Sequence, residues 1–375
     1  MATKKCTLDE LEPGMILDRT VLTDTGSTLM DAGTVLTAHH IDILKNRFSD
    51  GYMSFFINSA IMDEDLQALF MGDTPKVEPE TAVIDPRYKS LYQEVMDDMR
   101  LLIEQKQKYD VLDLELIGNF LADKKLDELC DGARAVSQIH SMKREGDYLL
   151  NHSIHVAILA GLMGRWLRWP RADRERLLLA GLLHDIGMLE VSDEIRNKKG
   201  SMNDVDRAII EKHPKYGCEM LMQSGLKKET DILSGVFQHH ERLDGSGYPE
   251  HLKGEEIYTY GRILAILDEY DSIAASSGSV NHPSPFEIFD TLSAEIMAGK
   301  LDAEYGILFI KNVCHALVGT WVRLTDGQKA RIVYIDQSRT SALPIVETER
   351  GDFWDIATKK DVKVKEFLTV DEISE

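Results

Sequence analysis

The spacing of hydrophobic residues separates a long central region of the chain from two shorter flanking regions. Between residues 146 and 317, apolar residues recur at helical spacing in successive segments, which capping residues and prolines separate. The pattern predicts helices over Asp147–Trp169, Arg174–Ile186, Asn203–Lys212, Thr230–His240, Tyr258–Ala275, Ser284–Met297 and Asp302–Leu317. The protein is therefore expected to be mainly α-helical, with an all-helical bundle at its centre.

The period of the apolar positions changes after Gly319 from that of a helix to that of a strand. Asp326-Gly327 lies between two apolar runs and is typical of a hairpin turn, and Leu343–Val346 predicts a further strand. We expect residues 318–375 to form a small C-terminal β extension and interpret it as a structural cap.

Residues 1–75 predict a small mixed α/β domain. Val21–Leu22 and Thr28–Met30 flank the turn sequence Asp24-Thr25-Gly26, which indicates a hairpin. Gly33–Leu36 predicts another strand, and His39–Phe48 predicts a short helix.

Residues 76–145 predict a linker followed by helices. Asp73–Pro86 is polar and contains three prolines, and Leu91, Val95, Met99 and Leu102 then recur at helical spacing. The pattern leaves two interpretations open: an interdomain or dimerising segment, or helices that pack on the next domain.

Composition narrows the class of protein. The 375 residues include 43 Lys and Arg against 64 Asp and Glu, and the formal charge of −21 disfavours nucleic acid as a main partner. A small anionic substrate remains compatible, because metal ions at one site reverse the local field. Four widely separated cysteines, no apolar leader and no long apolar span predict a cytoplasmic protein without a membrane segment.

Potential metal ligands occur in five segments of the helical region, each about one helix and one loop from the next. A helix bundle brings one such ligand per helix to a common centre. Five histidines and two aspartates exceed the needs of one ion and predict a two-metal site, in which Asp185 bridges the ions. The predicted ligands are His152, His184, Asp185, His213, His239, His240 and Asp268.

The ligand types indicate the metal and its chemistry. Nitrogen and oxygen donors without thiolate favour iron or manganese, with zinc, nickel or cobalt as alternatives. Two such ions lower the pKa of bound water, generate hydroxide near neutral pH and hold a phosphoryl group for in-line attack. We assign the catalytic role to His184 and Asp185.

The segment from His239 to Pro249 predicts a tight loop beside the ligands, since it contains two glycines and ends in proline. Tyr248 is expected to pack on the substrate or to hydrogen-bond it. Arg242 is expected either to bind phosphate or to form an internal ion pair with Glu241 or Asp244. The predicted substrate contacts are Arg242, Gly247, Tyr248 and Pro249.

These motifs resemble the HD-GYP family, a branch of the HD phosphohydrolase superfamily. His184-Asp185 corresponds to HD and Gly247-Tyr248-Pro249 to GYP, and the resemblance, which covers 146–317, includes Asn151-His152-Ser153, His213-Pro214 and Asp268-x-x-Asp271. It implies an all-α bundle that holds two or three iron or manganese ions and hydrolyses cyclic di-GMP to pGpG and then often GMP. A homodimer and signalling-protein partners are further expectations.

The N-terminal region resembles a segment that often precedes this domain, from Leu11–Met15 through Ala32–Thr37. The resemblance implies a regulatory input through residues 1–75 and does not identify its ligand.

The chain departs from the family pattern on the expected substrate side. Met188 replaces a lysine, and Ser277 and Val280 replace basic residues that clamp the dinucleotide. Each lost charge-assisted phosphate contact weakens binding by roughly 1.5–3 kcal/mol, unless other basic residues compensate. Tyr148 stands where members with three metals carry glutamate, so two metals are expected. The candidate compensating residues are Arg196, Lys198, Lys199 and Arg242.

Three functions are compatible with this sequence. The first is a cyclic di-GMP phosphodiesterase, which the complete ligand set favours. The second is a phosphohydrolase of another cyclic dinucleotide or nucleotide, which the missing basic residues favour. The third is an effector that binds nucleotide or protein without turnover, and the complete ligand set disfavours it.

Overall fold

The computed structural model describes part of the chain, which divides into two compact units, Met1–Thr81 and Ala82–Glu375. In the first unit the described residues are short pieces between residues 3 and 58. In the second unit they are chiefly 85–122, 124–130, 135–141, 148–196, 202–275, 285–335, 343–359 and 361–368.

The first unit contains two antiparallel strand pairs. β1 (Thr3–Thr7) pairs with β4 (Ser54–Asn58), and β2 (Val21–Leu22) pairs with β3 (Thr28–Met30). The strands expected on either side of residues 24–26 are thus confirmed. The turn itself, most of the predicted strand Gly33–Leu36 and most of the predicted helix His39–Phe48 lie outside the described residues.

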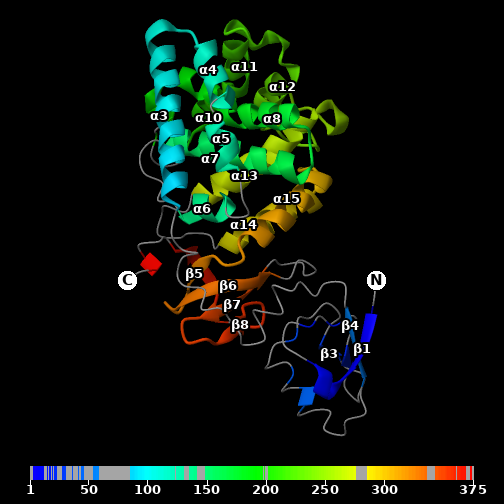
Figure 1. The fold of residues 1–375 in the computed structure, drawn as a ribbon. Coiled ribbons are helices and arrows are strands. Elements are labelled where there is room, and N and C mark those ends of the chain that lie inside the picture. Colours follow the sequence, from blue (N-terminus) through cyan, green and yellow to red (C-terminus); the bar gives the residue numbers. More distant parts are fainter. Residues whose placement is uncertain are drawn as a thin grey trace. The chain divides into compact units, whose positions relative to one another are not determined.

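The second unit is a helical bundle with a small sheet (Figure 1), which confirms the predicted fold class. Short 3-10 helices, among them η4 (Ile186–Glu190), connect some of the α-helices. The described α-helices are α3 (Pro86–Tyr109), α4 (Leu114–Ala122), α5 (Lys125–Leu129), α6 (Ala135–Ser141), α7 (Tyr148–Trp166), α8 (Arg171–Leu183), α9 (Asp193–Arg196), α10 (Asp204–Ile210), α11 (His213–Gln223), α12 (Thr230–Gln238), α13 (Thr259–Ala275), α14 (Pro285–Met297) and α15 (Ala303–Ala316).

Helix α7 lies at the centre of the bundle. Every residue from Leu149 to Gly164 is buried, as expected for a helix whose surface is apolar on nearly all sides. α8, α13 and α3 pack against it, and all four helices contribute to one continuous hydrophobic core. Polar side chains on α7 are therefore enclosed by protein and require partners inside it.

Several helix boundaries follow the predicted capping residues. The side chain of Asn203 caps α10, and that of Asp302 accepts two backbone N–H bonds at the start of α15. α7 ends three residues earlier than predicted, because Arg168 adopts a left-handed conformation with φ of 56°. α11 was not predicted, and it starts at His213 with Pro214 in its first turn.

The helix ends at the candidate site approach one another closely. A Cβ atom on Gly187 would lie 2.0 Å from the carbonyl oxygen of His213, so only glycine fits between η4 and α11. This contact fixes the segment after Asp185 against the segment that carries His213.

The C-terminal part of the second unit is a five-stranded antiparallel sheet in the order β8-β7-β6-β5-β9. The predicted hairpin joins β5 (Trp321–Leu324) to β6 (Lys329–Ile335), with Gly327 at a φ of 89° in its turn. β7 (Pro344–Thr348) was predicted, whereas β8 (Phe353–Asp355) and β9 (Val364–Phe367) were not. β9 packs against α14, so the sheet shares the core of the bundle.

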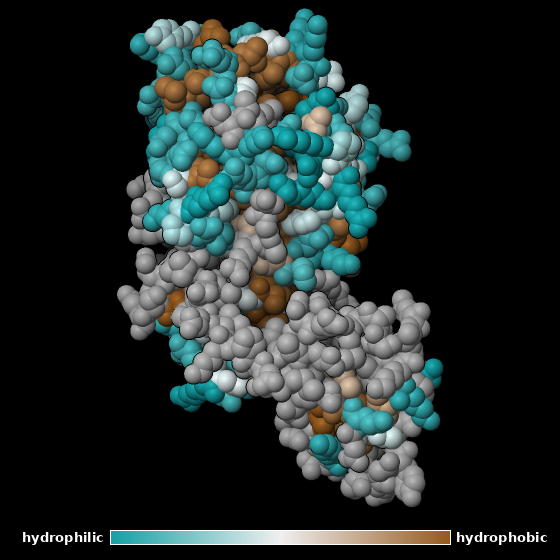
Figure 2. Space-filling view, in the orientation of Figure 1, coloured by the Kyte–Doolittle hydropathy of each residue, from teal (hydrophilic) through white to brown (hydrophobic). Residues whose placement is uncertain are grey.

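Apolar side chains are exposed at the end of the bundle where α3 and α4 meet, and Figure 2 shows apolar residues on that face. Tyr109, Val111 and Leu114 are 60%, 55% and 47% exposed. The expected homodimer stays a prediction. Within the part of the chain that the structure describes, none of the helices combines the length and apolar character that a membrane span requires.

Candidate metal centre

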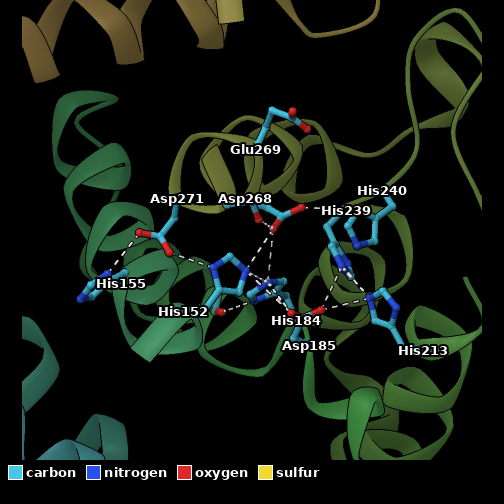
Figure 3. Close-up of polar contacts among 12 residues, drawn as sticks. His152, His155, His184, Asp185, His213, His239, His240, Asp268, Glu269 and Asp271 are labelled. Carbon is cyan, nitrogen blue, oxygen red and sulfur yellow. Dashed lines mark hydrogen bonds and ion pairs between the residues drawn. The ribbon is translucent and has the colours of Figure 1, made fainter. Parts of the chain in front are cut away.

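The seven predicted metal ligands face a common centre in the bundle (Figure 3). They form two clusters, in each of which the potential ligand atoms lie within 4.8 Å of one another. The open cluster, named for its two partly exposed members, consists of Asp185, His213, His239 and His240. The closed cluster, whose members are all buried, consists of His152, His184 and Asp268.

Asp185 lies between the two clusters. Its Oδ1 atom is 3.0 Å from Nε2 of His213, in the open cluster. Its Oδ2 atom is 3.6 Å from Nε2 of His184 and 3.7 Å from Nε2 of His152, both in the closed cluster. One carboxylate thus presents one oxygen to each cluster, which is the arrangement that a bridging ligand requires.

Three histidines are oriented by backbone carbonyls at helix ends. Nδ1 of His184 donates to the carbonyl of Gly181 at 2.7 Å, Nδ1 of His213 to Ile210 at 2.7 Å, and Nδ1 of His239 to Val236 at 2.8 Å. Each carbonyl lies in the last turn of its helix, where no intrahelical donor is available. With Nδ1 protonated, the Nε2 atom of each ring offers a lone pair to the centre.

These lone pairs face one another at short range. Nε2 of His213 lies 3.1 Å from Nε2 of His239, and Nε2 of His152 lies 3.1 Å from Nε2 of His184. Two neutral imidazoles in this orientation repel, and a shared cation or proton removes the repulsion. A donor set of imidazole nitrogens and carboxylate oxygens suits divalent transition metals, so the residues present fit such ions.

His152 is oriented by a carboxylate instead of a carbonyl. Its Nδ1 atom lies 2.8 Å from Oδ2 of Asp271, and Nδ1 of His155 lies 3.1 Å from the other oxygen. All three side chains are buried. Asp271 belongs to a motif that was recognised in the sequence without a role, and His155 was not identified from the sequence. The spacing of three residues from a ligand on the same helix, for Asp271 after Asp268 and for His155 after His152, would have indicated both.

Burial and neighbouring charges alter the pKa values of the ligands in both clusters. Burial lowers the pKa of His184 to about 4 and that of His240 well below its ordinary value. Burial also acts to lower the pKa of His213, but the carboxylate of Asp185 outweighs it and the pKa is raised.

The pKa of His152 is raised for the same reason as that of His213. Burial acts to lower it, but the carboxylates of Asp268 and Asp271 outweigh burial, so the pKa of His152 lies well above the ordinary value. The pKa values of Asp185 and Asp268 are lowered despite burial, because histidines surround them. Each cluster therefore contains an ionised carboxylate and one histidine with a raised pKa. In the metal-free protein that histidine attracts a proton at the place where the same donors could bind a cation.

The loop that follows the paired histidines is held against the open cluster. The Tyr248 ring stacks on His240 with centroids 4.6 Å apart and an interplanar angle of 29°. A Cβ atom on Gly247 would lie 2.4 Å from both the amide nitrogen of Arg242 and the carbonyl oxygen of His240. The buried carboxylate of Glu241 accepts hydrogen bonds from two backbone amides beyond Pro249, which fixes the end of the loop.

Three of the four basic residues considered as replacements, Arg196, Lys198 and Arg242, have acidic partners. The Arg242 guanidinium donates to Glu269 at 2.8 Å and to two backbone carbonyls, so its carboxylate partner is neither Glu241 nor Asp244. Arg196 pairs with Asp193, and Lys198 pairs with Asp206.

The departures from the family pattern lie partly within the described residues. Met188 is partly buried in η4, and the Tyr148 ring stacks on His152 with centroids 5.4 Å apart. Lys199, Ser277 and Val280 lie outside the described residues. The number of ions stays a prediction.

Comparisons with known proteins show what the central region is similar to. Residues 128–304 match the family model described as HD domain. A cyclic di-GMP phosphodiesterase, PA4108 of Pseudomonas aeruginosa, is 31% identical over 52% of this chain and 46% of its own length. The 3'3'-cGAMP-specific phosphodiesterase 3 of Vibrio cholerae is 37% identical over 34% of this chain and 27% of its own length.

A solved structure supports the fold. Bd1817, an HDG"Y"P protein from Bdellovibrio bacteriovorus, aligns with a TM-score of 0.50 and 17% identity over 83% of this chain and 99% of its own. The match covers less than half of the length of the two curated relatives named above, and the activities in their names belong to those proteins.

Proposed function

We propose that the protein is a metal-dependent phosphodiesterase of cyclic dinucleotides, since residues 128–304 match the HD domain family model. The relatives named above support this class of substrate. Cyclic di-GMP, cleaved to the linear dinucleotide pGpG, is the proposed substrate, and iron or manganese the proposed metal.

The position of Asp185 carries the proposal. Its two oxygens face two separate clusters of imidazole and carboxylate donors, so the chain offers two adjacent cation sites that share one ligand. A binding module that recognised nucleotide alone would not need this arrangement of buried, mutually repelling donors.

The proposed ligands of each ion follow from the two clusters. His213, His239 and His240 would hold one ion and His152, His184 and Asp268 the other, with Asp185 shared. Two divalent ions supply Lewis acidity towards a phosphate and a water of lowered pKa, so no serine or cysteine nucleophile is needed.

Other groups of the chain orient the metal ligands and border the site. The backbone carbonyls of three helix ends hold the histidine rings in place, so their Nε2 atoms need not reorganise on binding. The stacked Tyr248 gives the open cluster an aromatic surface beside which a nucleobase or ribose can pack.

A specific observation favours a second candidate substrate, a cyclic dinucleotide other than cyclic di-GMP. Arg196, Lys198 and Arg242 are each paired with a carboxylate, so these described basic residues do not replace the charge expected where Met188 stands. The relative from Vibrio cholerae is named for 3'3'-cGAMP, which makes that nucleotide the alternative to test.

The experiment is chromatography of nucleotides after incubation with the purified protein, prepared without oxygen and loaded with iron or manganese. Cyclic di-GMP, 3'3'-cGAMP and cyclic di-AMP are compared at equal concentration. Asp268→Asn serves as the variant with a damaged closed cluster, and Asp361→Asn, an exposed residue in the C-terminal region, as its matched control.

Conversion of cyclic di-GMP by the wild type and the Asp361→Asn protein, but not by Asp268→Asn, supports the proposal. A higher kcat/KM for 3'3'-cGAMP assigns the protein to the second candidate substrate. No product from any of the three nucleotides, with two ions bound per chain, contradicts the proposed activity.

A further inference from the structure

A buried set of polar side chains connects the closed cluster to helix α3. Asp271 accepts from His152 with one oxygen and contacts Nδ1 of His155 with the other. The His155 ring lies 5.8 Å from the ring of Tyr92 on α3. The Tyr92 hydroxyl donates to Oδ1 of Asn151 at 3.0 Å, and Asn151 immediately precedes the metal ligand His152.

Burying these polar side chains costs free energy of desolvation, which indicates that they have a role. His155 and Asp271 are each 1% exposed, Tyr92 is 4% exposed and Asn151 is 5% exposed. The surrounding faces of α3 and α7 are apolar, so phenylalanine or leucine would pack there without any desolvation cost. A carboxylate in this position needs a donor for each oxygen, and His155 provides the second one.

The geometry also explains what the second donor does. A carboxylate held at one oxygen can rotate about its χ2 angle, whereas one held at both oxygens keeps a fixed plane. His155 thereby fixes the oxygen to which Nδ1 of His152 donates, and with it the direction of the lone pair on Nε2. Partners of this kind, one step beyond the ligands, typically change metal affinity by about 10–100-fold.

We propose that His155 is a positioning residue for the ligand His152, acting through Asp271, and that Tyr92 of α3 supports the same ligand through Asn151. The inference rests on the proposed binding of metal by the closed cluster. α3 is the first described helix after the N-terminal unit, so the chain's connection to that unit runs through a helix that contacts this polar set.

The test is calorimetric titration of Mn²⁺ into the full-length metal-free protein. His155→Phe removes the donor and keeps a ring of similar size, and His155→Asn keeps a donor near the position of Nδ1. We expect His155→Phe to weaken one of the two binding steps by about 10–100-fold and to leave the other unchanged. His155→Asn should stay within about fivefold of the wild type, and His315→Phe, an exposed histidine on α15, should not differ from it.

A second pair of variants tests the contribution of α3. Tyr92→Phe removes a single hydroxyl and should weaken the same step by about two- to fivefold, whereas Tyr109→Phe, exposed on the same helix, should have no effect. In a double-mutant cycle, Tyr92→Phe and His155→Phe should deviate from additivity, because both act on the orientation of His152.

The outcomes separate this inference from the proposed function. A wild type that binds no Mn²⁺ overturns the metal centre itself. A wild type that binds two ions, with His155→Phe within twofold of it or with His155→Asn as weak as His155→Phe, overturns the role of His155. If His155→Phe does not fold, the Tyr92→Phe measurement decides, and unchanged Mn²⁺ binding overturns the proposal.

Discussion

The two clusters of the metal centre use similar ligands in different surroundings. In the open cluster, the side chains of Asp185 and His240 are 14% and 20% exposed, and His240 carries the stacked ring of Tyr248. In the closed cluster, the side chains of His152, His184 and Asp268 are 2%, 0% and 6% exposed. One cluster thus borders the solvent and the glycine-rich loop, whereas the other is enclosed by α7, α8 and α13.

The way in which the histidines are held differs as well. His213 and His239 donate to backbone carbonyls, which no substitution of a side chain removes. His152 donates to Asp271, whose other oxygen contacts His155. The comparison teaches that changes near the loop should act on substrate binding, while changes near α3 should act on metal affinity.

The largest effect is expected from Asp185→Asn, because this residue belongs to both clusters. The change removes the shared negative charge and replaces one of the two oxygens by an amide nitrogen, so it should lower Mn²⁺ affinity in both binding steps and reduce turnover by more than about 100-fold. Metal content and rate are measured on the same preparation, with circular dichroism to check that the helices persist. Turnover near the wild-type rate would contradict the shared role of Asp185.

The next effect concerns the basic residues that the family resemblance implies and that this sequence lacks. Met188→Lys combined with Ser277→Arg adds two cations where the family resemblance implies phosphate contacts, so KM for cyclic di-GMP should fall about tenfold or more. Steady-state kinetics check this. Met202→Lys, the same kind of change at an exposed methionine, is the matched control and should leave KM unchanged.

Tyr248→Ala should have a smaller effect that is confined to substrate. Loss of the ring removes a surface worth about 0.5–1.5 kcal/mol in stacking, so KM should rise about three- to tenfold. Mn²⁺ affinity should not change, since the tyrosine is not a ligand. Tyr248→Phe keeps the ring and should lie close to wild type. An equal loss of metal affinity would remove the distinction between the clusters.

The smallest effect is a change in thermal stability with pH. In the metal-free protein, the pKa values of His152 and His213 are raised above the unfolded value of about 6.5. The stability that these protons contribute is complete below pH 6.5 and is lost as pH rises through the raised values. The lowered pKa values of His184 and His240 act only below pH 6.5.

The quantity to measure is the direction in which Tm changes with pH. Between pH 7 and pH 9, Tm of the metal-free protein should fall by a few degrees, whereas Tm with saturating Mn²⁺ should hold or rise, because metal replaces the protons. Comparing the two slopes cancels contributions from groups outside the centre. Parallel slopes with and without Mn²⁺ would show that His152 and His213 do not exchange protons for metal.

The sequence was sufficient to predict the helical fold and to select the residues that the structure brings together. Helical periodicity and capping residues such as Asn203 and Asp302 are local signals, and they are read without knowledge of tertiary contacts. The metal ligands were selected because potential ligands recur at intervals of about one helix and one loop, and a helix bundle brings such residues to a common centre.

The rest depends on contacts between distant segments. Asp271 and His155 were missed as a pair because they are more than a hundred residues apart along the chain and meet only when α13 packs on α7. Glu269 was missed as the partner of Arg242, because the two meet only when the loop after α12 lies beside α13. α11 was missed because its apolar positions are few, and its helix is stabilised mainly by contacts with η4 and α12.

The hydrogen bonds from histidines to the ends of α8, α10 and α12 have a consequence for how such a protein loses its activity over time. The Nδ1 atom of each of these ligands serves as a helix cap, so replacing the ligand also leaves a carbonyl without its donor. Drift away from this ligand set would therefore weaken the ends of three helices as well as the binding of metal. The repulsion between the facing imidazoles would remain in a protein that no longer bound metal, so such a lineage would gain from changes that remove one ring of each pair and cap the helix in another way.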